Sequence, residues 1–227
     1  MALGFVAVAS AGERTAPARV WREGVEYTRL AVPAPRVTSG NTVEVVQVFW
    51  YSCSGCDFFE PNLLRWLARK DARATFVRIP ATWTAAHRAD ARLFYALQVL
   101  HRGDLHQAVY DSIHRQHRLL TAPRDEDTEL LQVQFAKAHG ISAQDFKRAL
   151  ASAEVAQAMR RADETVRRYR VTATPSMVIN GKYTTNDAQA GGREELIALV
   201  NYLIGLEHRA GAGRAAKRPT ALSASAR

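Results

Sequence analysis

The stretch WYSCSGCD, residues 50–57, decides the interpretation of this chain, because it contains both cysteines of the sequence. Cys53 and Cys56 are separated by two residues, at the point where an apolar segment gives way to a helical pattern. Pairs with this spacing occur in redox centres, zinc sites and haem attachment sites. The spacing alone therefore leaves the chemistry open, and the surrounding sequence has to decide it.

The residue types around the pair disfavour metal and haem. A structural zinc ion takes about four Cys or His ligands, yet the sequence has no second cysteine pair, and the histidine nearest to Cys56 is His87. Haem attachment requires histidine directly after the second cysteine, where this chain has Asp57. A structural disulfide closing so short a loop would stabilise the fold little. We therefore predict a redox-active pair, with no metal and no cofactor.

The flanking patterns predict a strand before the cysteines and a helix after them. Residues 43–51 are almost all β-branched, apolar or aromatic, which is typical of a strand buried on both faces. Apolar residues recur at helical spacing over 57–70. Cys53 is thus expected at or just before the first helical turn, where free N–H groups and the helix dipole favour a thiolate. We predict Cys53 as the attacking nucleophile and Cys56 as the resolving cysteine.

The remaining chain alternates between sheet segments and a long helical region. Expected segments are strands at 27–32, 75–79, 176–179 and 182–185, four or five helices over 83–169, and a last helix at 193–206. The first strand, helix and strand form a unit that implies parallel pairing. Asn180-Gly181 is a dipeptide favoured in a type I′ hairpin turn.

Charge and hydropathy at the two ends indicate segments outside the folded core. Residues 2–11 are small and apolar, and 9–11 have the small-x-small form of a signal-peptidase site, although a basic segment before them is missing. At the other end, residues 208–227 supply five of the formal charges of +9 and contain no acid or aromatic residue. We expect an export-signal remnant and flexible N-terminus at 1–18, a disordered basic tail at 208–227, and no nucleic-acid partner.

Several separated pieces of the chain resemble the DsbA family of bacterial periplasmic thiol-disulfide oxidoreductases. Besides the cysteine pair they are Gly24 to Tyr27, Val45 to Tyr51, Phe59 to Pro61, Thr174 to Tyr183 and Ala190 to Gly192. The resemblance covers about residues 20 to 206. It implies an α/β thioredoxin-like fold with a helical insertion.

On this resemblance the chain divides into four parts besides the N-terminal segment. The expected parts are the first half of the thioredoxin fold at 19–82, the helical insertion at 83–165, the second half at 166–207 and the tail at 208–227.

The resemblance also implies a reaction, partners and a location. The Thr174–Pro175 bond is expected to be cis and to face the cysteines across a groove where extended substrate segments bind. Substrates would be reduced, cysteine-containing exported proteins in the periplasm, which the enzyme oxidises. A DsbB-like, quinone-linked membrane oxidase would restore the disulfide, and we expect a monomer.

Three residues, in two places, depart from the family's usual ones. Ser54-Gly55 stands where the family usually has Pro-His, so the histidine that stabilises the nucleophilic thiolate is missing. Gln47, six residues before Cys53, stands where a buried acid usually assists proton transfer. We interpret Gln47 as a buried polar residue hydrogen-bonded beneath the active site. We also expect a higher Cys53 pKa and a less oxidising disulfide than in a typical DsbA.

Other functions remain open at the level of sequence. The missing histidine, together with Thr174 before the proline, also suits a periplasmic disulfide reductase or isomerase of the same fold. A copper-binding thioredoxin-like module is a further alternative, with both cysteines and a histidine as ligands. His114 and His117 are predicted to share a helix face and supply the candidates for that role.

Overall fold

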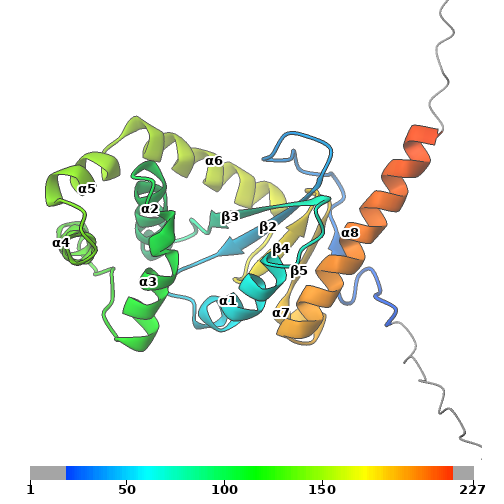
Figure 1. The fold of residues 1–227 in the computed structure, drawn as a ribbon, viewed down its shortest axis with the longest axis horizontal. Coiled ribbons are helices and arrows are strands. Elements are labelled where there is room, and N and C mark those ends of the chain that lie inside the picture. Colours follow the sequence, from blue (N-terminus) through cyan, green and yellow to red (C-terminus); the bar gives the residue numbers. More distant parts are fainter. Residues whose placement is uncertain (1–18, 217–227) are drawn as a thin grey trace, which may run out of the picture.

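A single mixed sheet organises the molecule, and the computed structural model describes residues 19–216 (Figure 1). Its strand order is β1-β5-β4-β2-β3. The central strand β2 (Val43–Phe49) runs parallel to β3 (Ala74–Pro80) and antiparallel to β4 (Ser176–Ile179). The strands β5 (Tyr183–Asn186) and β1 (Thr28–Arg29) complete the sheet. The predicted parallel pairing of the first two long strands is therefore confirmed.

Helices surround the sheet and form a lobe beside it. After β2 comes α1 (Ser54–Leu67), and the chain ends with α7 (Asp187–Ala190) and α8 (Arg193–Ala216). The segment between β3 and β4 contains α2 (Ala85–Val99), a 3₁₀ turn (Gly103–Leu105), α3 (His106–Tyr110), a π-helical turn (Asp111–Arg115), α4 (Asp125–Ala138), α5 (Ala143–Leu150) and α6 (Ala153–Tyr169). None of the helices in the described part of the chain is long and apolar enough to cross a membrane.

Two layers of helices bury the two faces of the sheet. Val45 contributes to a core with residues of α1 and α8, whereas its neighbours Val46 and Val48 contribute to a second core with α6. Every residue of β2 is buried, as the unbroken apolar pattern predicts. The cysteine pair thus follows directly after a fully buried central strand.

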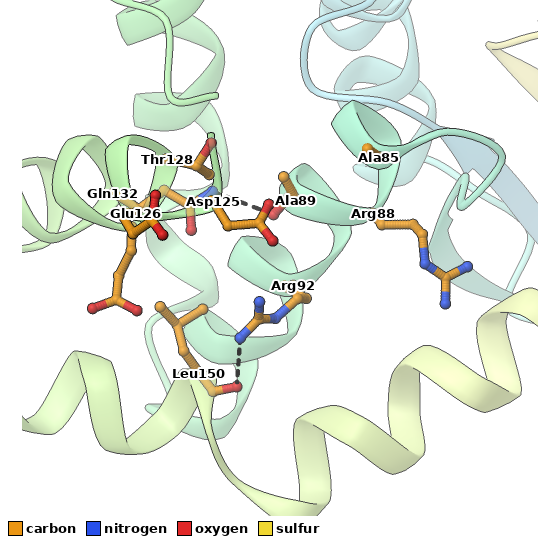
Figure 2. Close-up of a pocket in the computed structure, with 10 residues that line it drawn as sticks. Ala85, Arg88, Ala89, Arg92, Asp125, Glu126, Thr128, Gln132 and Leu150 are labelled. Carbon is orange, nitrogen blue, oxygen red and sulfur yellow. Dashed lines mark hydrogen bonds between the residues drawn. The ribbon is translucent and has the colours of Figure 1, made fainter. Parts of the chain in front are cut away.

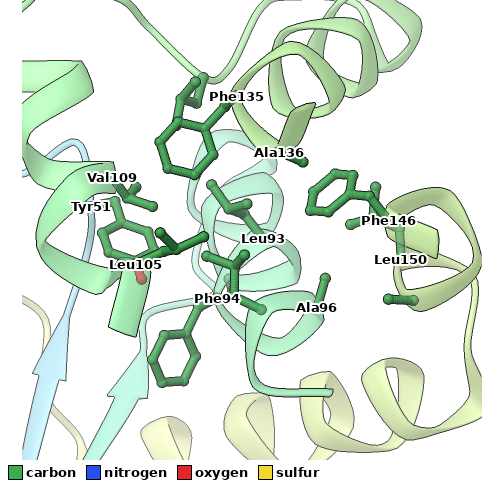
Figure 3. Close-up of a cluster of buried hydrophobic side chains, with 14 of the residues drawn as sticks. Tyr51, Leu93, Phe94, Ala96, Leu105, Val109, Phe135, Ala136, Phe146 and Leu150 are labelled. Atoms are coloured by element: carbon green, nitrogen blue, oxygen red, sulfur yellow. The ribbon is translucent and has the colours of Figure 1, made fainter. Parts of the chain in front are cut away.

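A third core fills the helical lobe and reaches the active-site loop. Figure 3 shows Tyr51 among side chains of the lobe such as Phe94, Leu105 and Val109. Cys56 belongs to the same core and is fully buried. The insertion therefore packs directly against the residues on both sides of Cys53.

One detail of the predicted elements is confirmed and one is wrong. The 180–181 turn has φ values of 53° and 63°, as a type I′ turn requires. Glycine is needed at 181 because a Cβ there would overlap the carbonyl oxygen of Ala34. The tail expected to be disordered from residue 208 is helical as far as Ala216, because α8 continues into it. Four alanines, the residue with the highest helix propensity, accompany Gly211 and Gly213 in this segment.

The expected boundary between the helical insertion and the second half of the thioredoxin fold lies within a helix. The boundary between 165 and 166 falls inside α6, whose later residues cover the sheet. The segments 1–18 and 217–227 lie outside the described residues.

Candidate active site

Cys53 occupies the N-cap of α1, in agreement with its predicted position. Its backbone is extended, with φ −83° and ψ 113°, and its sulfur accepts a hydrogen bond of 3.3 Å from the Cys56 N–H. The helix begins at Ser54, three residues earlier than its apolar pattern indicates. The sulfur itself supplies the cap that makes this early start possible.

The two cysteines have opposite ionisation behaviour. Both are free thiols, Cys53 half-buried and Cys56 fully buried. The pKa of Cys53 is lowered to about 6, mainly by its hydrogen bond with the Cys56 side chain, and further by Thr174 and by N–H groups of the helix N-terminus, against the effect of burial. Burial raises the pKa of Cys56 well above that of an ordinary thiol, and the neighbouring Cys53 adds to this effect. At neutral pH Cys53 is thus the nucleophile and Cys56 a thiol.

The segment before β4 completes the front of the site. The Thr174–Pro175 peptide bond is cis, as the resemblance implies. The Cys53 thiol donates a hydrogen bond of 3.3 Å to the Thr174 carbonyl oxygen. A Cβ at Gly55 would lie 3.4 Å from Cδ of Pro175. The structure therefore brings Cys53, Gly55, Thr174 and Pro175 together, although 121 residues separate Cys53 from Thr174.

Gln47 is buried as expected, but its predicted hydrogen bonding is wrong. Its side chain is 0% exposed, and neither amide atom has a hydrogen-bond partner among the described residues. It lies opposite Met177 of β4 and Arg78 of β3 in the sheet register. The apolar residues that flank it in β2 explain the burial, and they offer it no polar partner.

Side chains from the helical insertion hold the active-site loop, and the sequence did not reveal them. Asp90 of α2 accepts hydrogen bonds from the N–H and hydroxyl of Ser52, at 3.2 and 2.8 Å. Burial raises the pKa of Asp90 to about 6, although the bonds from Ser52 act in the opposite direction. The residue before Cys53 is therefore tied to α2 on its backbone and its side chain.

The π-helical turn of the insertion makes two further contacts. His114 donates a hydrogen bond of 2.7 Å to the Tyr51 carbonyl oxygen. Arg115 forms an ion pair of 2.9 Å with Asp57, the residue after Cys56. π-Helical turns are often found at functional sites. Here the turn contacts the chain both before and after the cysteine pair.

A buried polar cluster lies behind the loop, and we define it as Tyr51, Glu60, Arg78, His106 and Tyr110. Glu60 forms an ion pair with Arg78, and its Oε1 lies 3.8 Å from His106 Nε2. The Tyr51 hydroxyl and His106 Nδ1 share a hydrogen bond of 2.9 Å. Burial alone would raise the pKa of Glu60, but His106 and Arg78 hold it below its usual value. Burial lowers the pKa of His106, so the imidazole is neutral at pH 7.

The two histidines considered for copper do not share a helix face. His114 bonds to Tyr51, whereas His117 follows the end of the π-helical turn, is exposed and has φ 54°. The predicted shared face fails because the helix ends at Arg115. Across residues 19–216 no three His, Cys, Asp or Glu side chains lie together in an arrangement that could hold a metal ion.

A separate pocket in the lobe has no part in this arrangement. Figure 2 shows it between α2 and α4, with a volume of about 380 Å³, where Arg92 donates a hydrogen bond to the Leu150 carbonyl. Its lining includes none of the residues around the cysteines. The chemistry of the chain therefore lies at the end of β2 rather than in this pocket.

Comparison with known proteins agrees with the site geometry. The family model described as DSBA-like thioredoxin domain matches residues 51–201. The chain is 33% identical to the thiol:disulfide interchange protein DsbA of Pseudomonas aeruginosa over 207 residues, 91% of this chain and 95% of the relative. It is 30% identical to the Azotobacter vinelandii protein of the same name, covering 90% and 92% of the two chains.

Solved structures give the same result. The crystal structure of Pseudomonas aeruginosa DsbA superposes with a TM-score of 0.76 at 32% identity, over 85% of this chain and 97% of that chain. The DsbA oxidoreductase of Xylella fastidiosa superposes with a TM-score of 0.77 at 23% identity, over 84% and 100%, which supports the fold. The thioredoxin-like fold with its helical insertion is thus shared along nearly the whole length of these proteins.

Proposed function

The chain belongs to the DsbA-like thioredoxin domain family and is a disulfide-forming thiol-disulfide oxidoreductase, and we propose that Cys53 and Cys56 are its redox pair. The observation that carries this proposal is the opposite ionisation of the two sulfurs at the N-terminus of α1. A thiolate at Cys53 is a good leaving group, which favours the transfer of the disulfide to a substrate. The relatives are DsbA proteins, so the reductase or isomerase alternative is not favoured.

The reaction proceeds through two exchanges. A substrate thiolate attacks Cys53 Sγ, the Cys53–Cys56 bond breaks, and Cys56 leaves with the electron pair and takes up a proton. The second substrate thiolate then attacks the substrate sulfur of the mixed disulfide and releases Cys53 as a thiolate. The substrate gains one disulfide and loses two electrons, which reside on the reduced cysteine pair.

The backbone beside Pro175 positions the substrate for the first exchange. The Thr174 carbonyl lies against the Cys53 sulfur at 3.3 Å. An extended peptide can pair with the chain at this point and place its cysteine over Cys53. Gly55 keeps this approach open because it has no side chain between the cysteines and Pro175.

The substrates are reduced, cysteine-containing exported proteins in the periplasm, and a quinone-linked membrane oxidase of the DsbB type reoxidises the pair. The similarity to proteins named thiol:disulfide interchange protein DsbA supports this substrate class. We propose that the protein acts as a monomer, with Ser54, Gly55 and Gln47 adjusting the strength of the oxidant.

The redox state of the pair in cells tests the direction of electron flow. Acid quenching followed by thiol alkylation should find Cys53 and Cys56 mostly as a disulfide. Purified protein should oxidise reduced ribonuclease, and Cys53→Ser should abolish that activity. A pair that is mostly dithiol in cells, or a Cys53→Ser variant with full activity, would contradict the proposal.

A further inference from the structure

The buried polar cluster contains an unusual number of unsatisfied groups. Within residues 19–216 no hydrogen-bond partner exists for Glu60 Oε2, Arg78 Nε, His106 Nε2 or the Tyr110 hydroxyl. An unpaired buried polar atom costs free energy, and such atoms in native proteins bind buried water or take part in chemistry. Their concentration in one place indicates that the cluster has a role beyond stability.

Tyr110 connects this cluster to the buried cysteine. Its ring packs against those of His106 and Tyr51, with centroid separations of 5.2 Å in both cases. Cys56 lies in the same core as Tyr110. Burial raises the pKa of the Tyr110 hydroxyl, and the charges of Cys56 and Glu60 add to this effect. Tyr110 therefore shares its buried surroundings with Cys56 and contacts the polar cluster through the His106 ring.

Cys56 needs a group that can donate a proton to it and accept one from it. It must take up a proton when it leaves Cys53 and lose it before it can attack again. The Gln47 side chain cannot transfer this proton, because an amide does not exchange a proton at neutral pH. A second buried acid, Asp90, accepts both hydrogen bonds of Ser52 through Oδ2, on the Cys53 side of the loop, and its Oδ1 has no partner among the described residues.

The far side of the cluster reaches solvent away from the substrate. Arg78 and His106 line a pocket of about 570 Å³ between β3, α2 and α6. Cys53, Thr174 and Pro175 are absent from its lining. The charged groups facing this opening from α6 are Glu154 and Arg161. A proton can thus enter or leave here while a substrate covers Cys53.

We propose that Glu60, His106 and Tyr110 form a proton relay between Cys56 and this pocket. The proposal rests on the redox role of the cysteine pair. In substrate oxidation, a proton passes from the pocket through His106 and Glu60 to Tyr110 and on to the departing Cys56 sulfur. In reoxidation it returns by the same groups, and the Cys56 thiolate attacks the mixed disulfide at Cys53. The Tyr110 hydroxyl and Glu60 Oε2 both have unused hydrogen-bonding capacity for this transfer.

In this route His106 acts through Glu60 and Tyr110 rather than on the substrate. The groups facing His106 are Glu60 of α1, Arg78 of β3, Tyr51 of the loop and Tyr110 of its own helix. Its neutral imidazole can accept a proton, and the Glu60 carboxylate beside it stabilises the resulting cation.

Stopped-flow kinetics of the Cys56 step tests the relay. The reduced protein is converted to a Cys53–glutathione mixed disulfide, and the release of glutathione by Cys56 is followed between pH 5 and 9. Since general acid–base assistance contributes about 10²-fold or more, Tyr110→Phe and His106→Gln should slow release about 10- to 100-fold at pH 7. The loss should shrink towards the alkaline end, where hydroxide removes the proton. His87→Gln, which alters the histidine stacked on Trp50, is the matched control and should release glutathione at the normal rate.

Tyr110→Phe keeps the test decisive even where the histidine variant folds poorly, because the lost hydroxyl makes no hydrogen bond to the described residues. Formation of the mixed disulfide at Cys53, measured in the same experiment, should be unchanged in every variant. Normal release in a folded Tyr110→Phe variant overturns the relay and leaves the redox role of the pair intact. Failure of the wild type to form or resolve the mixed disulfide would instead contradict the proposed function.

Discussion

Cys53 and Cys56 lie one helical turn apart, yet the surroundings of the two sulfurs differ in origin. The Cys53 environment is local: the N-terminus of α1, the neighbouring cysteine and the Thr174–Pro175 segment lower its pKa to about 6. The Cys56 environment is made by distant elements, because the helical insertion buries it and raises its pKa. The thioredoxin half of the fold therefore supplies the nucleophile Cys53. The helical insertion surrounds Cys56 and controls how readily this cysteine gains and loses a proton.

The largest expected effect on stability lies behind Cys56. Arg78→Ala leaves the Glu60 carboxylate buried without its ion-pair partner. Breaking a buried pair in this way costs about 3–5 kcal/mol of unfolding free energy, which urea denaturation would measure.

The matched control is Arg124→Ala, which removes an exposed pair with Asp127. Surface pairs contribute about 1 kcal/mol or less. Equal losses of unfolding free energy in Arg78→Ala and Arg124→Ala would show that the buried ion pair behind Cys56 stabilises the fold no more than an exposed pair does.

The next effect concerns the contact between the insertion and the Cys53 loop. The pKa of Asp90 is raised to about 6 from an ordinary value of 3.8, so the folded state binds a proton more tightly than the unfolded chain does. The contribution of Asp90 to the unfolding free energy should therefore fall as pH rises from about 4 to 6, by about 2–3 kcal/mol relative to a variant that cannot ionise at this position. Asp90→Asn should remove this fall, because its amide does not ionise.

Denaturation of the oxidised protein at pH 4 and pH 7 checks this prediction. The exposed helix-start residue Asp125 supplies the control, and Asp125→Asn should keep the fall of the wild type. If the unfolding free energy of Asp90→Asn falls as much as that of the wild type, Asp90 does not cause this pH dependence.

A third change transfers the family's usual histidine into the local environment of Cys53. Gly55→His places an imidazolium near the thiolate, and an opposite charge within about 4–6 Å lowers a pKa by about 1–3 units. The Cys53 pKa should fall from about 6 towards the ~3.5 found for DsbA itself. Equilibration with glutathione should show a more oxidising disulfide.

Gly55→Ala separates charge from bulk, because its Cβ alone meets Pro175 at 3.4 Å. We expect its Cys53 pKa to stay near that of the wild type. Equal shifts in the alanine and histidine variants would mean that contact with Pro175, rather than charge, controls the thiolate.

The same contrast explains what the sequence could predict. The cysteine pair, the type I′ turn and the Thr174–Pro175 segment are short patterns whose meaning depends on neighbouring residues. Asp90 and His114 are polar residues on helices, 38 and 63 residues from their partners in the loop. Nothing in a helical pattern distinguishes such residues from solvated ones until the packing of the insertion is known.

Gln47 shows the limit of local patterns most clearly. Its burial follows from the apolar strand around it, whereas the presence of a hydrogen-bond partner depends on β3, β4 and α1. The same reasoning missed Glu60, because a carboxylate on α1 appears solvent-facing unless Arg78 is known to lie beneath it.

A pH titration of the reduced protein is the most direct test of the difference in ionisation between Cys53 and Cys56. Ultraviolet absorbance counts the thiolates, and alkylation followed by mass spectrometry identifies the cysteine that reacts at each pH. We expect one ionisation at about pH 6, assigned to Cys53, and no second ionisation below about pH 9, since Cys56 remains a thiol. First ionisation near pH 9, or earlier alkylation of Cys56 than of Cys53, would contradict it.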